Sequence, residues 1–338
     1  MYRHIAANAL TLLILAVIGV GVVIGWGQKE FRTAGPLGDD TLVAIERGAN
    51  LGTATAALQD AGAISNATIF RMAARYSGAD RTLKFGDYLI PAGATMEEVL
   101  EIITSGRSFS YNVTIPEGWT SWQVVQRLNE VDGLTGELTE IPPEGSLAPN
   151  TYAYSRNTSK ADLIAQMTQA QVKVLEDAWL TRDPETPLQT REEALILASI
   201  VEKETGLAEE RPQVASVFVN RLNRGMLLQT DPTVIYGITL GQGSLGRGLR
   251  RSELDRATPY NTYVIKGLPP TPIANPGKAA IEAALNPAAT EFVFFVADGT
   301  GGHAFARTLS EHNANVRKWR VIEKQRAEEA AAAAQSVE

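Results

Sequence analysis

The chain contains no cysteine, and this absence excludes several kinds of chemistry at once. Without thiols there is no disulfide framework, no thiolate nucleophile and no cysteine ligand for zinc. Histidine is scarce as well: His4, His303 and His312 are all there are, and no metal-site spacing of His or carboxylates occurs. No G-x-S-x-G elbow is present, so a serine nucleophile would depend on His303 as its base. Carboxylates remain as the catalytic groups, and we expect neither a metal nor a cofactor.

The chain also lacks an excess of positive charge. Its formal net charge is −7 at pH 7, and no basic stripe with interleaved aromatic residues appears. Nucleic acid is therefore not an expected partner. With 338 residues, the chain is long enough for a sizeable core and favours two domains over one.

One long hydrophobic run is present, and it lies near the N-terminus. The stretch from Ile5 to Trp26 carries no charge, and its length suits one bilayer crossing of about 20 residues. A cleaved signal peptide is the alternative, but no small-x-small cleavage site precedes the polar residues after Trp26. The charge rule is indecisive, because Arg3 precedes the run and Lys29 and Arg32 follow it. We expect residues 1–28 to form an uncleaved signal anchor, with the globular part outside the cytoplasmic membrane.

Two similar segments follow a linker at residues 29–40. The residues Val43, Ile45, Gly48 and Leu58 align, at a constant offset of seventy, with Val113, Ile115, Gly118 and Leu128. Each segment predicts a short strand, a glycine turn and an amphipathic helix. A strand through Tyr88–Ile90 and a helix that begins near Met96 lie between them. We expect a small α+β module over residues 41–108, either a common scaffold or a module that positions a polymeric substrate.

A helix predicted over Gln189–Thr205 gives the strongest functional signal. Four aliphatic residues recur in it at helical spacing: Ile196, Leu197, Ile200 and Val201. Glu204 extends this apolar face, whereas Glu202 is expected on the opposite, wetter side near Ala198 and Ser199. A carboxyl held against aliphatic side chains keeps its proton near neutral pH, as a general acid requires. Glu204 is thus the catalytic candidate, and the alternative is that both glutamates are solvated helix-end charges.

A polar and aromatic cluster follows. A second helix is predicted over Glu209–Arg224, and beyond it Thr230 and Asp231 precede Pro232, which makes one of them the predicted helix cap. Amide, carboxyl and phenol groups on a Pro/Gly-rich background suit a neutral, hydroxyl-rich ligand. The predicted substrate-binding residues are Gln229, Asp231, Tyr236, Tyr260, Asn261 and Tyr263.

Three further segments have structural interpretations. The helix predicted over residues 160–180 serves packing, and the apolar run at residues 291–298 predicts a buried strand. Residues 321–338, rich in Ala and Glu, predict a solvated helical tail.

The segments from Ala198 onward resemble the membrane-anchored endolytic murein transglycosylases. The resemblance rests on these motifs in chain order: ASIVEKET at 198–205, ERPQVASVFVNRL at 210–222, QTDPTVIYG at 229–237, YNTY at 260–263, GLPP at 267–270, IANPG at 273–277 and FVADGTGGHAF at 295–305. It implies an α+β chain with one N-terminal transmembrane helix, a LysM-like α+β module, and a mixed α/β catalytic domain over residues 109–320 with a catalytic helix. It also implies that Glu204 is the catalytic glutamate.

The sequence departs from the family pattern at residues 144–152. Family members usually read Glu-Gly-Tyr-Leu-Phe-Pro-Asp-Thr-Tyr there, and this chain reads EGSLAPNTY. Two rings and one carboxylate are absent, which puts a sugar-stacking role of this loop in doubt.

The resemblance implies a reaction as well as a fold. Protonated Glu204 would donate to the glycosidic oxygen between N-acetylmuramic acid and N-acetylglucosamine, and then accept the proton of the muramic C6 hydroxyl as a 1,6-anhydro ring closes. A hydrolytic muramidase is the first alternative, with Asp231 or Glu202 as the second carboxylate. A non-catalytic wall-binding scaffold is the second.

The resemblance also implies partners and a location. The partners are peptidoglycan glycan strands and the peptidoglycan synthases (penicillin-binding proteins) at the membrane. The location is the bacterial inner membrane, with a single-pass anchor and the catalytic domain on the periplasmic side.

Overall fold

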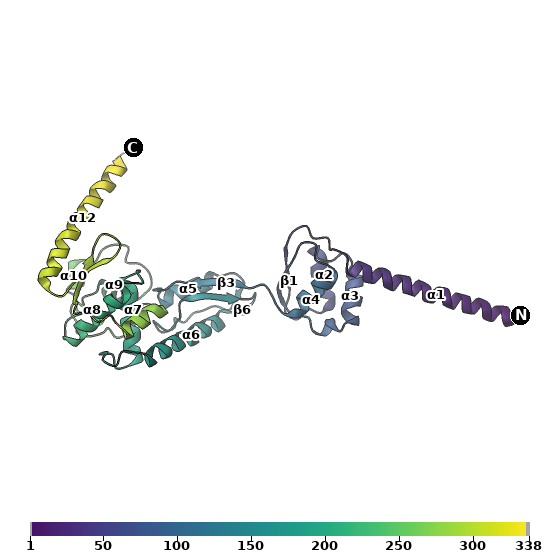
Figure 1. Cartoon of the computed structure of the whole chain (residues 1–338), viewed down its shortest axis with the longest axis horizontal. Coiled ribbons are helices and arrows are strands. Elements are labelled where there is room, and N and C mark those ends of the chain that lie inside the picture. The colour runs from purple at the N-terminus through teal and green to yellow at the C-terminus, as the bar shows by residue number, and fades with distance from the viewer. Residues whose placement is uncertain (1, 336–338) are drawn as a thin grey trace. The chain divides into compact units, whose positions relative to one another are not determined.

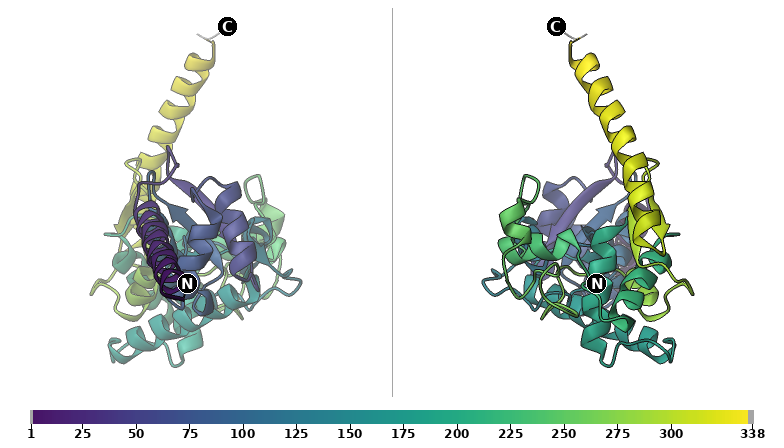
Figure 2. Two further views of the ribbon diagram at one scale, coloured as in Figure 1. Left: turned by 90° about the vertical axis from the view of Figure 1, so that its right-hand side faces the viewer. Right: turned by 90° about the vertical axis from the view of Figure 1, so that its left-hand side faces the viewer.

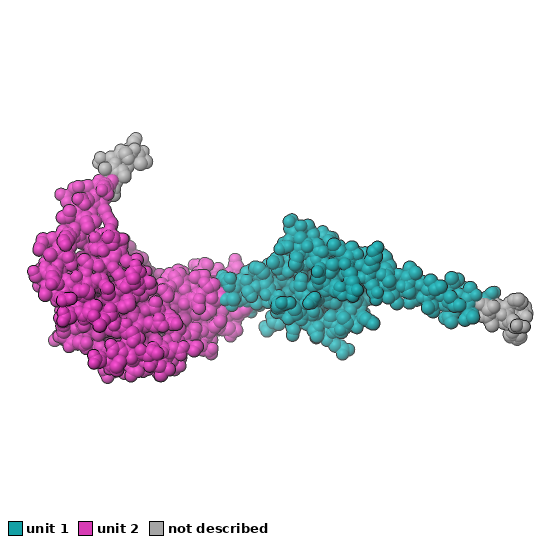
Figure 3. Space-filling view, viewed as in Figure 1, with its two compact units in different colours: residues 1–112, 153–157 teal, residues 113–152, 158–338 magenta. Residues whose placement is uncertain are grey.

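The computed structural model describes residues 2–335 and divides the chain into two compact units. Unit 1 comprises residues 1–112 and 153–157, and unit 2 comprises residues 113–152 and 158–338 (Figure 3). Both units mix helices with strands, and every sheet in the described part of the chain has two strands. The expected boundary between residues 108 and 109 lies close to the division after Asn112. Unit 1 also includes residues 153–157, which come later in the chain.

Helix α1 (Tyr2–Phe31) contains the N-terminal hydrophobic run. Its portion Leu10–Phe31 is long and apolar enough to cross a membrane, and none of its most apolar window is buried against the protein. The helix continues three residues beyond the expected end of the anchor at residue 28. The end of α1 is held against the rest of unit 1. Arg32, directly after the helix, donates to Glu97 at 3.2 Å, and Ser65 donates to Glu30 of the last turn at 2.9 Å.

The remainder of unit 1 is a two-stranded sheet covered by short helices (Figure 1). Strand β1 (Thr41–Ile45) pairs antiparallel with β2 (Gly86–Ile90), with Thr41 opposite Ile90. The helices are α2 (Leu51–Asp60), α3 (Ala67–Tyr76), the 3₁₀ turn η1 (Ala79–Arg81) and α4 (Met96–Ser105). Inward-facing side chains of the sheet and helices form one core that includes Val43, Ile45, Leu58, Phe70, Tyr88, Ile90, Val99 and Ile103.

The predicted internal repeat is confirmed by the element boundaries. Strand β3 (Tyr111–Ile115) and helix α5 (Ser121–Glu130) lie seventy positions after β1 and α2. Gly48 and Gly118 have φ angles of 83° and 75° in the corresponding turns, a conformation that strongly favours glycine. Both helices begin with a reciprocal capping box, which satisfies amide groups of the first turn.

Unit 2 is built around helix α7 (Arg191–Glu204). Four helices contact it: α6 (Lys160–Leu180), α8 (Arg211–Asn223), α9 (Asp231–Thr239) and α11 (Lys278–Leu285). The bounds of α6 are those predicted, and α7 and α8 lie within the predicted ranges. Because neighbours surround α7, it is buried on nearly every side from Ala194 to Val201. The last turn of α7 reaches the edge of this core, where Lys203 is exposed and Glu204 is partly buried.

Short strands and the last helix complete unit 2. The strands are β4 (Leu134–Thr135), β5 (Asn150–Tyr154, whose last two residues are counted with unit 1), β6 (Thr158–Ser159), β7 (Phe294–Ala297) and β8 (His303–Ala306). Strand β5 pairs with β3, and β4 pairs with β6. Helix α10 (Arg251–Leu254) is a single turn. Helix α12 (Leu309–Gln335) projects from the body of unit 2 (Figure 2). It includes the predicted tail but begins well before residue 321, and residues 336–338 lie outside the described part.

The prediction of a buried strand at residues 291–298 was wrong in its burial. All four residues of β7 are only partly buried, since β7 pairs with β8 alone and a two-stranded ribbon leaves much of its surface uncovered. Phe294 stacks on His312 of α12, and Phe295 packs edge-on against Phe218 of α8.

Asn275 joins three segments of unit 2 that are distant in sequence. Its side chain is fully buried; the carbonyl oxygen accepts from the Leu147 amide at 2.9 Å, and the amide donates to the Trp119 carbonyl at 3.0 Å. Asn275→Ala leaves the buried Leu147 amide without its partner, whereas the Trp119 carbonyl still accepts from the Asn275 backbone amide. We therefore expect a loss of about 1–3 kcal/mol in the free energy of unfolding. Denaturant unfolding followed by tryptophan fluorescence measures it, with Asn223→Ala at an exposed position as the control. Equal stability of the two variants would contradict the assignment.

Candidate functional site

Glu204 is the last residue of α7, and it is partly buried in unit 2. Ile200 and Val201, one turn earlier, are fully buried. Burial raises the pKa of the Glu204 carboxyl above its ordinary value of 4.5, because a charge is costly away from water. A glutamic acid in this environment retains its proton at higher pH than a surface glutamate, and it can therefore act as an acid near neutrality.

Thr230 holds the Glu204 carboxyl by a direct hydrogen bond. Its hydroxyl donates to Oε1 of Glu204. Thr230 is itself fixed, because its backbone amide donates to the Thr262 hydroxyl at 3.0 Å and its carbonyl accepts from the Thr233 hydroxyl at 2.8 Å. Thr230 occupies the N-cap position of α9 but makes no side-chain cap bond. The predicted cap position is therefore right, but its side chain serves the glutamate instead of the helix.

The groups around Glu204 have opposite effects on the pKa of its carboxyl. Burial is the largest influence on the Glu204 pKa and raises it, and the neighbouring Asp231 raises it further. The hydrogen bond from Thr230 and the charges of His303 and Arg221 lower it. The net direction is upward, so burial prevails.

Arg221 and His303 are each anchored by partners other than Glu204. Arg221 is buried and donates to the carbonyls of Val293 and Leu228, both at 2.6 Å. His303 Nδ1 lies 2.8 Å from the Glu210 carboxylate, which also accepts from the His303 backbone amide at 2.8 Å. Both residues are thus fixed parts of the electrostatic surroundings of the site.

Asp231 and Tyr263 form a pair beside Glu204. The Tyr263 hydroxyl donates to Oδ1 of Asp231 at 2.6 Å, and Asp231 is exposed. Burial, the bond to Asp231 and the charge of Glu204 together raise the Tyr263 pKa above its usual value, so the phenol remains protonated. Two of the predicted substrate-binding residues therefore lie together in the electrostatic environment of Glu204.

Tyr236 and Tyr260 form a second pair, on α9 and the loop after α10. Their rings lie 5.1 Å apart at an angle of 58°. The Tyr260 hydroxyl bonds the Thr271 hydroxyl at 2.8 Å, and the Tyr236 hydroxyl donates to Glu144 at 3.1 Å. Both rings remain partly exposed.

Gln229 and Asn261 differ in what their side chains can offer. Gln229 is exposed and has a φ of 49°, an uncommon conformation for a non-glycine residue, directly before Thr230. Asn261 is fully buried, and its amide donates to the carbonyls of Leu254 and Arg256 at 2.9 and 2.6 Å. Its oxygen accepts from the Tyr263 amide at 3.0 Å. The side chain of Asn261 is thus bonded to backbone groups, and it shapes the loop that carries Tyr263.

The expectation of a wetter face around Glu202 was wrong. Ala198 and Ser199 are fully buried, because α11 and the 272–277 loop cover this side of α7. The side chain of Glu202 is only 6% exposed, accepts from the Gly277 amide at 2.9 Å and lies 3.9 Å from Arg211. Burial raises its pKa as well. Helical periodicity predicts one buried face, but α7 is a central helix that other segments cover on several sides.

Three further residues of the site were not predicted from the sequence. Glu144 lies in the segment that departs from the family pattern; it accepts from the Ser121 amide at 2.7 Å, and burial raises its pKa. Thr230 was considered only as a cap. Arg221 lies on the inward face of α8 with Val214 and Phe218. A charged residue on that apolar face was the feature of the sequence that could have marked it as part of a site.

The described residues contain no group of three or more His, Asp or Glu side chains arranged to hold a metal ion.

Replacement of Thr230 by valine tests how the carboxyl is held. A hydrogen bond to a charged group contributes about 1.5–3 kcal/mol, so we expect kcat of a reaction that depends on Glu204 to fall by roughly tenfold to a hundredfold. Because the bond lowers the Glu204 pKa, its loss moves the corresponding limb of the pH–rate profile to higher pH. Thr230→Ser keeps the hydroxyl and is the matched control. A profile that does not move in Thr230→Val would contradict the assignment.

Comparison with known proteins shows what this chain is similar to. The sequence model of the YceG-like family matches residues 43–318. An endolytic murein transglycosylase from Bacillus subtilis (strain 168) is 29% identical over 301 residues, covering 80% of this chain and 82% of the relative. One from Streptococcus pneumoniae serotype 2 (strain D39) is 29% identical over 366 residues; the match covers 93% of this chain but only 65% of the relative. A crystal structure of a YceG-like protein from Listeria monocytogenes has a TM-score of 0.50 and 28% identity, covering 82% of this chain and 99% of that one.

Proposed function

The chain belongs to the YceG-like family, and from this membership we propose that it is an endolytic murein transglycosylase in which Glu204 is the catalytic acid and base. The observation that carries the assignment is the buried Glu204 carboxyl, whose pKa is raised and whose orientation Thr230 holds. The substrate is the glycan strand of peptidoglycan, and the bond cleaved joins N-acetylmuramic acid to N-acetylglucosamine.

One carboxyl performs both proton transfers. Protonated Glu204 donates to the glycosidic oxygen as its bond to the muramic anomeric carbon breaks, through an oxocarbenium-like transition state. The muramic C6 oxygen then bonds to that carbon, and ionised Glu204 accepts the proton that the C6 hydroxyl gives up. No water is consumed, and the product carries a 1,6-anhydro end.

Residues around Glu204 position the sugar and the carboxyl. Thr230 keeps Oε1 in place and leaves the other carboxyl oxygen to face the substrate. Gln229, Asp231 and Tyr263 offer exposed or partly exposed polar groups beside it. The partly exposed rings of Tyr236 and Tyr260 provide stacking faces for sugar rings.

The hydrolytic alternative needs a second carboxylate that activates water. Asp231 accepts a 2.6 Å bond from Tyr263, and Glu202 is occupied by the Gly277 amide. Both carboxylates have structural partners, which favours the non-hydrolytic reaction.

The other parts of the chain serve the location of this reaction. The proposal places the LysM-like module in unit 1 and the catalytic domain in unit 2, with α7 as the catalytic helix. Helix α1 anchors the protein as a single-pass segment, with both units on the periplasmic side, where glycan strands are synthesised. Peptidoglycan synthases are the proposed protein partners, and cleavage of nascent strands terminates their elongation.

Mass analysis of products from purified peptidoglycan tests the reaction type. The full-length protein in detergent is expected to give anhydro-muramic ends, one water lighter than reducing ends. Asp231→Asn is expected to give the same product with activity reduced by no more than about tenfold, the effect of one hydrogen bond of about 1.4 kcal/mol. Reducing ends from the wild type, lost in Asp231→Asn, would establish a hydrolase instead. No cleavage by a folded protein that binds glycan would favour the scaffold.

A further inference from the structure

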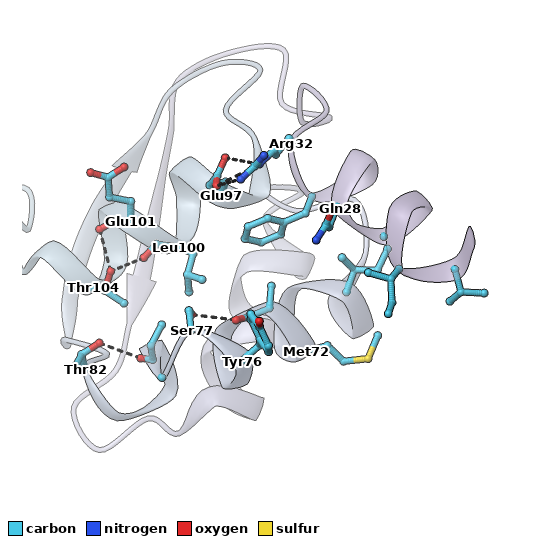
Figure 4. Close-up of a pocket in the computed structure, with 18 residues that line it drawn as sticks. Gln28, Arg32, Met72, Tyr76, Ser77, Thr82, Glu97, Leu100, Glu101 and Thr104 are labelled. Atoms are coloured by element: carbon cyan, nitrogen blue, oxygen red, sulfur yellow. Dashed lines mark hydrogen bonds and ion pairs between the residues drawn. The ribbon is translucent and has the colours of Figure 1, made fainter. Parts of the chain in front are cut away.

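A crevice of about 960 Å³ lies within unit 1, where the end of α1 passes α3 and α4 (Figure 4). Residues of α1 line one side, among them Val23 and Ile24, and residues of α3 line the other, among them Met72 and Tyr76. No residue of the sheet lines the crevice, whereas Ile69 and Leu100 of the unit 1 core are among its lining residues. Nothing in the proposed cleavage reaction uses it.

Helix α3 carries more apolar surface than its own core requires. Its buried residues are Ile69, Phe70 and Ala74. Met72 and Tyr76, one turn apart on the crevice side, are 60% and 97% exposed. An exposed tyrosine beside an exposed methionine suits a membrane surface, where one end of the tyrosine side chain meets apolar surroundings and the other meets water.

The crevice lies at the end of the apolar run of α1. Val23 and Ile24 belong to that run and remain exposed although they line the crevice. Trp26 follows them by about 5 Å or less along the helix axis, and tryptophan is typical of the membrane–water interface. The crevice is therefore continuous with the surface of α1 that would face lipid. Figure 4 shows Met72 pointing toward the same side as the continuing α1 ribbon.

Basic residues flank this apolar surface. Arg71 and Arg75 each precede one of the exposed apolar residues of α3 and are themselves exposed. Long basic side chains at such positions extend toward phosphate groups while their stems lie on apolar surface. Acidic groups are present on the α4 side, where Glu97 is paired with Arg32.

We propose that α3 lies in the membrane interface and that a phospholipid of the surrounding leaflet occupies the crevice. Its acyl chain packs against Val23, Ile24 and Met72, the Tyr76 ring lies at the headgroup level, and Arg71 and Arg75 contact phosphate. Unit 1 is then held against the bilayer by a second contact besides α1. The inference rests on the proposed membrane anchor and is independent of the cleavage chemistry.

Single spin labels test the proposal directly, because the chain has no cysteine and each introduced one is unique. The full-length variants Met72→Cys and Tyr76→Cys are labelled and reconstituted in vesicles of phosphatidylethanolamine and phosphatidylglycerol. Leu42→Cys is the control, an exposed apolar position on β1 that does not line the crevice. Val17→Cys reports on α1. Collision with oxygen, which enriches in lipid, is compared with collision with a water-soluble nickel complex.

Labels at positions 17, 72 and 76 are expected to collide severalfold more with oxygen, relative to nickel, than the label at position 42. Labels at 72 and 76 that match position 42, while position 17 is in lipid, would overturn this inference and leave the anchor intact. A label at 17 that also contacts water would overturn both. Shielding of 72 and 76 from both reagents would indicate a covering protein and would also overturn it. Glycan cleavage by the same preparations reports separately on the catalytic assignment.

Discussion

Glu204→Gln is expected to lower glycan cleavage by at least about a thousandfold. Glutamine has almost the same shape but can neither donate nor accept the proton, and a positioned acid or base typically contributes about 10²–10⁴-fold to the rate of each step it assists. In the proposed reaction one group assists both the departure of the sugar oxygen and the closure of the anhydro ring. The Thr230 hydroxyl can still donate to the amide oxygen of the introduced glutamine, so the local structure should persist. Release of soluble fragments from purified peptidoglycan, followed by chromatography, measures the change.

Two variants on the same helix make this result specific. Glu192→Gln changes an exposed glutamate in the first turn of α7 and should leave cleavage unchanged. Glu202→Gln changes a buried glutamate that accepts from Gly277, and it should reduce cleavage far less than Glu204→Gln. Glu204 would not be the acid if folded Glu204→Gln still cleaved glycan. The same conclusion would follow if Glu202→Gln abolished cleavage and Glu204→Gln did not.

The second large effect is on stability as a function of pH. Folding raises the pKa of Glu204, so the unfolded chain loses this proton near the ordinary value of 4.5 and the folded protein keeps it to higher pH. The unfolded state therefore binds fewer protons as pH rises above 4.5, and the free energy of unfolding of the wild type falls until pH passes the folded pKa. Each unit of pKa difference corresponds to about 1.4 kcal/mol.

Glu204→Gln removes this dependence. We expect the variant to gain stability relative to the wild type from about pH 4.5 upward, with a plateau that marks the folded pKa. Glu144 and Glu202 have raised pKa values too, but they are present in both proteins and cancel in the difference. Trp119, Trp122, Trp179 and Trp319 lie in unit 2, so their fluorescence in denaturant titrations follows mainly the unit that holds Glu204. Glu192→Gln is the control, and a constant Glu204→Gln difference across pH 4–9 would contradict the prediction.

Local patterns were sufficient to predict most elements of the fold. The strand–turn–helix repeat was predictable because Gly48 and Gly118 mark the turns that require positive φ, and apolar periodicity marks the helices. Helix α6 was predicted with its observed ends for the same reason. Glu204 was identifiable because it continues an apolar face, and a carboxyl there is unusual.

The arrangement around Glu204 could not be predicted, because it depends on contacts between segments distant in sequence. The hydroxyl of Thr230 contacts Glu204 across 26 positions, and Asn275 reaches Leu147 across 128. The environment of Glu202 was mispredicted because helical periodicity describes one helix and not the number of neighbours around it. The burial of β7 was mispredicted because composition does not reveal that its sheet has only two strands.

The return of residues 153–157 to unit 1 constrains how such a protein can be divided or recombined. Arg156 in this segment pairs with the buried Asp87 at 2.8 Å, and Tyr111 donates to the same carboxylate at 2.6 Å. A gene truncated after residue 112 would therefore encode unit 1 without the arginine that balances its buried aspartate. Exchange of this module between genes by one crossover would separate the same partners. To transfer unit 1 alone, recombination would need a junction after residue 112 and one on each side of the returning segment.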